Sequence, residues 1–138
     1  MTPYLLDTNL LLAYVAQKPA WQRTTSIVKR SPYTLSMSIV NESEIKAIAD
    51  YRGRGIPKRL KLDQLISRCG VYPISGSKIV DAYVRLSVQC RRRGLKLSQN
   101  DTWIAATAIL YKRHLLTSDK DFIPIAKEFV GFTWIEPN

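Results

Sequence analysis

The sequence predicts an α/β protein in which a mostly parallel sheet lies between two layers of helices. Two observations support this prediction: short β-rich runs recur along the chain, and longer segments with helical periodicity separate them. Strands that alternate with helices are typical of parallel sheets, and right-handed crossovers place the helices on both faces. A chain of 138 residues fits one domain with one sizeable core, so we expect residues 1–138 to form a single domain.

Short apolar or β-branched runs, mostly flanked by polar or turn residues, are the predicted strands. In chain order these runs are 4–6, 33–37, 71–74, 115–117 and 133–135. Pro73 cannot donate a backbone hydrogen bond, so the third run is expected at an edge of the sheet.

Segments with apolar residues at helical spacing are the predicted helices. They are 10–16, 21–29, 41–51, 58–69, 78–93 and 101–111. Their apolar stripes are read as core faces. The stretch 52–57 combines Gly, Pro and Arg and is predicted to be a basic loop between two helices.

The net charge of +10, from 21 Lys and Arg against 11 Asp and Glu, favours a polyanionic partner such as nucleic acid. Charge also promotes solubility, so alone it indicates no chemistry. No apolar run approaches the roughly 20 residues of a membrane span, and no basic stretch precedes the first apolar run. We therefore expect no membrane association, no signal peptide and a cytoplasmic location.

The two cysteines, Cys69 and Cys90, lack the spacing of metal ligands, which argues against a zinc site. Reduced thiols are expected, and a disulfide between the two is the alternative that the sequence leaves open.

Four acids fall where predicted strands end or the following helices begin. Asp7 follows the first strand, Glu44 lies in the first turn after the second, Asp101 opens a helix, and Asp119 follows the 115–117 strand. Each has an ordinary structural explanation. Asp7 and Asp119 suit helix N-caps, and the pairs Asn41–Glu44 and Ser98–Asp101 have the spacing of capping boxes.

Taken together, the four acids predict a metal site. In a parallel sheet the strand ends and the starts of the following helices share one edge, where functional crevices form. Clustered carboxylates repel one another unless a cation compensates, and hard divalent cations prefer oxygen ligands. Mg²⁺ or Mn²⁺ on a basic chain suggests phosphodiester chemistry. Nearby polar residues could support such a site, although each is also an ordinary turn or cap residue: Asn9, Thr117, Ser118 and Asp121.

At these residues the sequence resembles the PIN domain, and in particular the VapC-type toxin endoribonucleases. The ordered stretches 4–9, 35–45, 100–108 and 115–122 carry the resemblance and span nearly the whole chain. The resemblance implies a five-stranded parallel sheet, RNA cleavage dependent on Mg²⁺ or Mn²⁺, a homodimer and a small antitoxin partner. It assigns the core acids to Asp7, Glu44 and Asp101, with Asp119 as a more variable fourth.

One departure from the family pattern leaves the second acid open, because Glu42 occupies a position that is usually small or apolar in the family. Glu42 therefore competes with Glu44, and only one of the two should point at the crevice. Asn9 and Thr117 match supporting polar positions of the family.

Basic segments could hold an RNA substrate such as tRNA, although solvated helix ends explain any single residue equally well. The candidates are Arg52, Arg54, Lys58, Arg59, Arg91, Arg92 and Arg93, with Lys96 nearby. Three other functions compete with the ribonuclease: a structure-specific DNA nuclease, a nuclease-inactive PIN-like module that binds RNA or protein, and an aspartyl-phosphate phosphatase. The last normally has a second Asp two positions after the first, where this chain has Asn9.

Overall fold

The structure is a computed structural model that describes residues 3–28, 35–53 and 55–138. In chain order the elements are β1 (Tyr4–Leu6), α1 (Thr8–Ala16), α2 (Pro19–Val28), β2 (Leu35–Ser38), α3 (Ile39–Tyr51), α4 (Ile56–Arg68), β3 (Gly70–Tyr72), α5 (Ser77–Arg92), α6 (Gln99–Leu110), β4 (His114–Thr117), the 3₁₀ turn η2 (Lys120–Phe122), α7 (Ile123–Glu128) and β5 (Phe132–Trp134).

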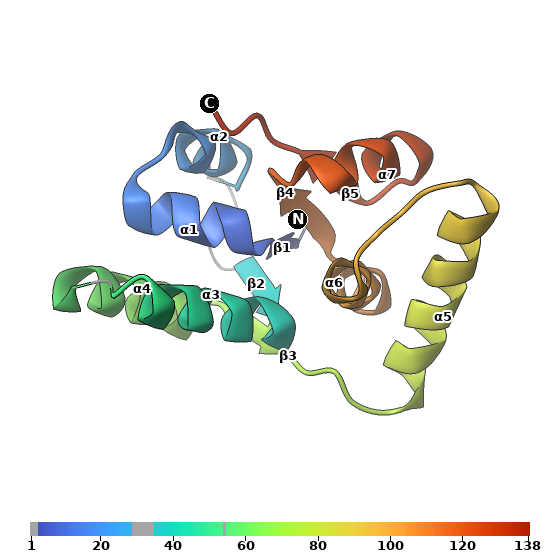
Figure 1. Cartoon of the computed structure of the whole chain (residues 1–138), viewed down its shortest axis with the longest axis horizontal. Helices are drawn as coiled ribbons and strands as arrows, with labels where there is room; N and C mark the ends of the chain where they lie inside the picture. Colours follow the sequence, from blue (N-terminus) through green and yellow to red (C-terminus); the bar gives the residue numbers. More distant parts are fainter. Residues whose placement is uncertain (1–2, 29–34, 54) are drawn as a thin grey trace.

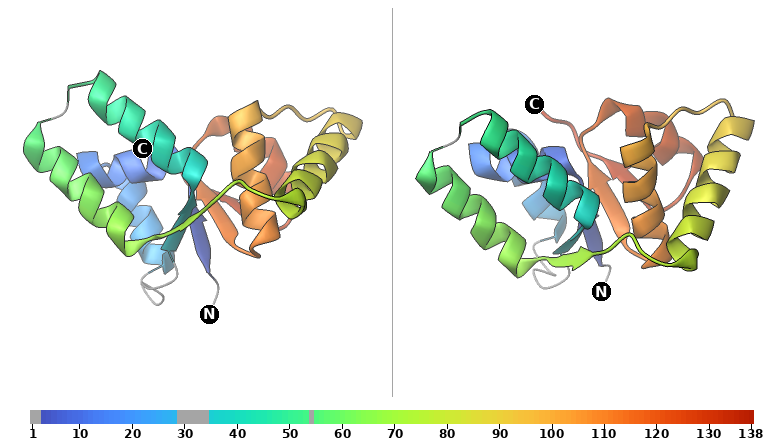
Figure 2. Two further views of the ribbon diagram at one scale, coloured as in Figure 1. Left: turned by 90° about the horizontal axis from the view of Figure 1, so that it is seen from below. Right: turned by 60° about the horizontal axis from the view of Figure 1, so that its bottom comes forward.

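The five strands form one sheet in the order β3-β2-β1-β4-β5, and every pairing between them is parallel. Helices α1 to α4 cover one face, and α5, α6 and α7 lie on the other (Figures 1 and 2). The predicted three-layer α/β/α sandwich is therefore confirmed, and the sheet is wholly parallel rather than mostly so. β1 lies at the centre between β2 and β4, so the residues that follow β1 and β4 emerge side by side.

Two hydrophobic cores fill the space between the sheet and its two helical layers. Leu6 and Leu116 point into the core under α1 to α4, whereas Leu5 and Leu115 point into the core under α5, α6 and α7. All four leucines are fully buried. The alternation follows from the period of two in a strand, and it explains why these short strands are apolar at successive positions.

The element boundaries differ from the predicted ones mainly at helix starts. α3 begins at Ile39 because Ser38 is its N-cap, so the Asn41–Glu44 capping box was wrong; Ser38 and Asn41 form the box instead. β3 is an edge strand, as predicted from Pro73, which follows its last residue. The predicted strand positions 33 and 34 and helix position 29 lie outside the described residues.

Among the described residues, no helix is long and apolar enough to cross a membrane. Cys69 and Cys90 are both free thiols.

Candidate active site

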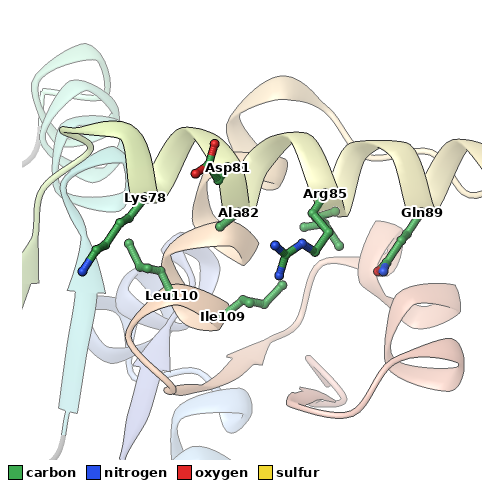
Figure 3. Close-up of a pocket in the computed structure, with 8 residues that line it drawn as sticks. Lys78, Asp81, Ala82, Arg85, Gln89, Ile109 and Leu110 are labelled. Carbon is green, nitrogen blue, oxygen red and sulfur yellow. The ribbon is translucent and has the colours of Figure 1, made fainter.

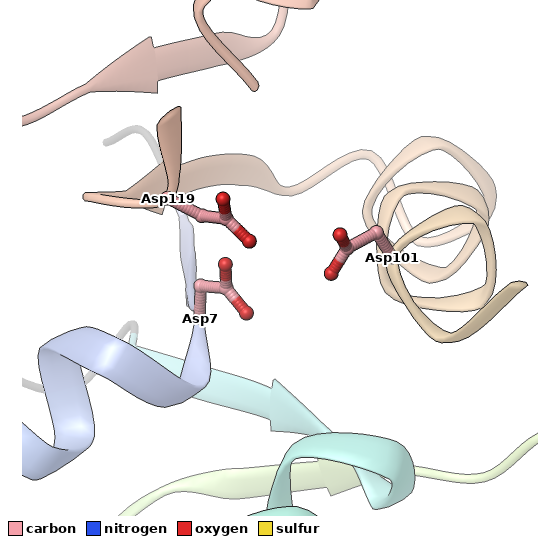
Figure 4. Close-up of side chains that lie close together, drawn as sticks. All are labelled: Asp7, Asp101 and Asp119. Atoms are coloured by element: carbon pink, nitrogen blue, oxygen red, sulfur yellow. The ribbon is translucent and has the colours of Figure 1, made fainter. Parts of the chain in front are cut away.

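Three carboxylates from distant parts of the sequence converge at the carboxyl edge of the sheet. Asp7 follows β1, Asp119 follows β4, and Asp101 lies in the first turn of α6. Each contributes a carboxylate oxygen, and these three oxygens all lie within 4.8 Å of one another. Figure 4 shows the three side chains pointing toward a common centre. The predicted convergence of these acids is therefore present in the fold.

Hydrogen bonds fix the buried carboxylate of Asp7, which is only 4% exposed. Its Oδ1 accepts from the Thr8 backbone N–H at 2.8 Å and from the Asn41 amide at 3.2 Å. Its Oδ2 accepts from the Thr117 hydroxyl at 2.6 Å. These donors stabilise the ionised carboxylate and hold its oxygens toward Asp101 and Asp119.

Thr117, the last residue of β4, links two of the acids. Its buried hydroxyl donates to Asp7 and accepts from the Asp119 backbone N–H at 3.0 Å. The contact with Asp7 follows from the β1–β4 pairing, which places Leu6 opposite Leu116 and leaves Asp7 beside Thr117. The contact with Asp119 is local, since the two residues are two positions apart. Thr117, predicted as a supporting residue, therefore hydrogen-bonds both the Asp7 carboxylate and the Asp119 backbone.

Glu44 lies beside the three aspartates without belonging to the group within 4.8 Å. Its Oε1 accepts from the Thr8 hydroxyl at 2.8 Å, and its Oε2 accepts from the Asn100 amide at 3.3 Å. Glu42 is instead paired with Lys46 at 3.5 Å along the surface of α3. Of the two competing glutamates, Glu44 is the one hydrogen-bonded to residues of the site.

Asn41 links Thr8, which donates to Glu44, with the buried Asp7. Its side-chain Nδ2 lies 3.2 Å from Asp7 Oδ1 and 3.0 Å from the Thr8 hydroxyl, while its Oδ1 accepts from the Ser38 backbone N–H at 3.0 Å. The residue is fully buried. Sequence reasoning gave no site role to Thr8, Asn41 or Asn100. For Asn41 a signal was available, because it is the polar member of the buried i, i+4, i+8 stripe that continues through Ile45 and Ala49.

Apart from the Asn41–Glu44 box, the capping contacts considered for these segments are also present. Asp7 caps α1 through the Thr8 N–H, Asp119 caps the 3₁₀ turn through the Asp121 N–H, and Ser98 caps α6 through the Asp101 N–H. Capping and clustering therefore coexist. Asp121, predicted as a supporting residue, donates its backbone N–H to Asp119, and the residue itself is exposed.

Asn9 and Ser118 border the cluster on the α1 side. The Ser118 backbone N–H donates to Asn9 Oδ1 at 3.1 Å, which ties the loop after β4 to the start of α1. Both residues line a pocket of about 350 Å³ that Arg52 also lines. These two polar residues position the loop that carries Asp119.

The basic candidates lie in two regions. Arg59 contacts Asp50 and Asp63, and Lys58 is exposed near Arg52; Arg54 lies outside the described residues. On α5 and just after it, Arg91 and Arg92 are exposed, whereas Arg93 contacts Glu128 at 3.6 Å and stacks on Phe129.

The electrostatics of the cluster are those of a site without a compensating charge. Burial raises the pKa of Asp7, and the negative charges of Asp119 and Glu44 raise it further. Burial, together with the charges of Asp7 and Asp119, raises the pKa of Asp101 to about 6. No described cation forms an ion pair with these carboxylates. The residues therefore fit a divalent cation, which would supply the missing positive charge through oxygen ligands.

The raised pKa of Asp101, caused first by burial and then by the neighbouring carboxylates, predicts an unusual pH dependence of stability for the metal-free protein. In the unfolded chain an aspartate titrates near ~3.9, so between that pH and about 6 folded Asp101 keeps a proton that the unfolded chain has lost. Folding stability from this group therefore falls as the pH rises through this window. In EDTA, Asp101→Asn should raise Tm by about 4 °C at pH 7.5 and by roughly half as much at pH 5. An equal shift at both pH values would contradict the raised pKa.

The sequence profile of the PIN domain matches residues 4–128, so the chain belongs to the PIN domain family. This confirms the family suggested by the motifs. No curated protein matches the sequence.

Several solved structures share this fold, and a toxin–antitoxin complex is among them. VapBC2 from Rickettsia felis, bound to a DNA fragment from its promoter, has a TM-score of 0.79 at 20% identity and covers 98% of this chain and 100% of that one. A toxin–antitoxin complex from Klebsiella pneumoniae has a TM-score of 0.71 at 23% identity, covering 94% and 95%. FitAcB from Neisseria gonorrhoeae has a TM-score of 0.70 at 20% identity, covering 94% and 95%. At these identities the likeness establishes the fold.

Proposed function

We propose that this PIN domain is a divalent-metal-dependent endoribonuclease and the toxin of a toxin–antitoxin pair. The observation that carries the proposal is the convergence of Asp7, Asp101 and Asp119, whose carboxylate oxygens lie within 4.8 Å of one another. Such a group of buried and half-buried acids is costly to assemble without a cation. Its presence on a chain of net charge +10 supports a phosphodiester substrate.

Asp7, Asp101 and Asp119 would hold the Mg²⁺ or Mn²⁺, and Glu44 would act beside them. When bound, the cation activates a water nucleophile and offsets negative charge on the phosphate. Asp7 is the most rigid of the acids, because Thr8, Asn41 and Thr117 all donate to it. The Glu44 carboxylate, held by Thr8 and Asn100, would orient a water or accept a proton from it. Attack in line with the leaving 3′-oxygen would give a 5′-phosphate and a 3′-hydroxyl.

Metal-free cleavage through the ribose 2′-hydroxyl has little support in this fold. That route needs a base and an acid, such as a pair of histidines. The single histidine, His114, donates to or accepts from Thr133 at the opposite end of β4 from Asp119, and burial lowers its pKa.

We propose two partners. Solved structures with the same fold include toxin–antitoxin complexes, which supports a small antitoxin as a protein partner. The proposed substrate, cytoplasmic RNA such as tRNA, rests on the family resemblance and on the net charge of +10. A homodimer is supported by α5, where Val80, Val84 and Val88 are 48%, 52% and 41% exposed at i, i+4 and i+8. An apolar stripe of this kind favours self-association.

The proposed activity is tested by incubating the protein with tRNA and with single-stranded and duplex DNA, in Mg²⁺, in Mn²⁺ and in EDTA. We expect cleavage of RNA with either metal, products that carry a 5′-phosphate, and no cleavage in EDTA. Cleavage of duplex DNA alone would favour the structure-specific DNA nuclease. Binding of RNA without cleavage under any of the metal conditions would favour the nuclease-inactive module.

A further inference from the structure

A pocket of about 450 Å³ lies between the end of α5, the following loop and the start of α6. We refer to it as the α5–α6 pocket. Thr102 lines it and directly follows Asp101 in the chain. In Figure 2 the loop runs from the end of α5 to the α6 terminus that carries the acid. The pocket therefore adjoins the helix end that contributes to the acid cluster.

The lining of the α5–α6 pocket combines apolar and cationic groups. Cys90, Leu95 and Leu97 form its apolar part, and these residues pack on the core beneath α5 and α6. Arg91 and Lys96 are exposed at its rim, and its lining includes no acid. Apolar walls with cations at the mouth match a nucleotide, which has a flat base and an anionic phosphate.

The backbone holds this pocket in a defined shape. Gly94 has φ of 70°, the left-handed conformation in which glycine carries no steric penalty. The turn brings the Leu95 N–H to the Cys90 carbonyl at 2.8 Å and closes α5. Leu95 is thereby placed against the core, so a ligand would enter a largely preformed site.

A neighbouring pocket on the same helix pair also combines apolar residues with cations, but its lining adds an acid. It has a volume of about 360 Å³, and its charged residues are Lys78, Asp81 and Arg85 (Figure 3). The acid reduces its attraction for phosphate. Its other lining residues include Gln89, which lies two positions after Ser87 of the α5–α6 pocket and provides a matched control.

We propose that the α5–α6 pocket binds one nucleotide of a single-stranded substrate that extends from the acid cluster. The phosphate of this nucleotide would contact Arg91 and Lys96, and its base would pack against Leu95 and Leu97. The inference rests on the proposed nuclease function. Residues 98–100 are exposed at the N-terminal end of α6, immediately before Asp101 and Thr102, and the strand would cross them. A paired base of a duplex is stacked and cannot enter such a pocket, so the site selects single strands.

The test compares Ser87→Glu with Gln89→Glu. Both changes add one negative charge to α5, but only the first adds it inside the α5–α6 pocket. Ser87→Glu also places the new carboxylate four residues before Arg91, a spacing that stabilises a helix. Affinity for a fluorescent 12-nucleotide single-stranded RNA is measured by anisotropy in EDTA. We expect about tenfold weaker binding for Ser87→Glu, a change below about twofold for Gln89→Glu, and a smaller salt slope for Ser87→Glu alone.

Equal weakening by the two variants, or no weakening by either, would overturn the nucleotide site. Metal-dependent cleavage by the wild-type protein is measured in parallel, so the nuclease function can stand while the nucleotide site falls. A wild-type protein that neither binds the RNA in EDTA nor cleaves it with Mg²⁺ or Mn²⁺ would overturn both.

Discussion

Asp101→Asn should lower kcat/KM for RNA about a thousandfold with Mg²⁺, a loss of roughly 4 kcal/mol of transition-state stabilisation. The substitution keeps the size and shape of the side chain but removes one of the three charges that face one another within 4.8 Å. Asp101 is only partly buried on the first turn of α6, so the fold should tolerate the amide. The rate is measured on the substrate that the wild-type protein cleaves best.

Asp121→Asn is the matched control, because Asp121 is a nearby acid whose exposed side chain receives no hydrogen bond from the cluster. We expect its kcat/KM to stay within about threefold of wild type, as befits an exposed position. A similar loss in both variants would mean that overall negative charge, rather than the cluster, determines the rate.

Asn41→Leu should lower the free energy of unfolding by about 3 kcal/mol and also reduce cleavage. The leucine has a similar volume but leaves the buried Ser38 N–H without its acceptor, and it removes donors to Asp7 and Thr8. A buried polar group that loses its partner bears the full cost of desolvation. Urea unfolding in EDTA measures the effect on stability separately from metal binding.

Asn100→Leu is the control for Asn41→Leu, since the Asn100 side chain is exposed and, within the described part of the chain, donates to Glu44 alone, at 3.3 Å. Its free energy of unfolding should change by no more than about 0.5 kcal/mol. If both variants lose the same stability, the buried amide of Asn41 has no special structural role.

The sequence was sufficient to predict the sheet and the positions of three aspartates, because those depend on local signals. Asp7 and Asp119 follow apolar runs that form adjacent parallel strands, and Asp101 lies three residues after a serine N-cap. Parallel topology then brings the strand ends and helix starts to one edge. These inferences need only the order of the elements, and no exact atomic positions.

The hydrogen-bond network around Glu44 could not be predicted in this way. It depends on how α3 packs against α1, which places Asn41 of α3 next to Thr8 of α1. Residues 42 and 44 lie on different sides of a helix, so their roles depend on the rotation of α3 that its buried residues fix. The predicted helix start at Asn41 was wrong for a different reason: Ser38 ends β2 and caps α3 at once, so no loop separates the strand from the helix.

The most direct test of the carboxylate cluster is Mn²⁺ binding to the wild-type protein and to Asp101→Asn, measured by isothermal titration calorimetry at pH 7.5 without nucleic acid. If Asp7, Asp101 and Asp119 form a metal centre, the wild-type protein binds one or two equivalents of Mn²⁺, and the variant loses at least one of them or binds it at least about tenfold more weakly. Equal binding by the two proteins, or no binding by either, would contradict the account and leave Asp7 and Asp119 as helix caps and Asp101 as a first-turn acid of α6.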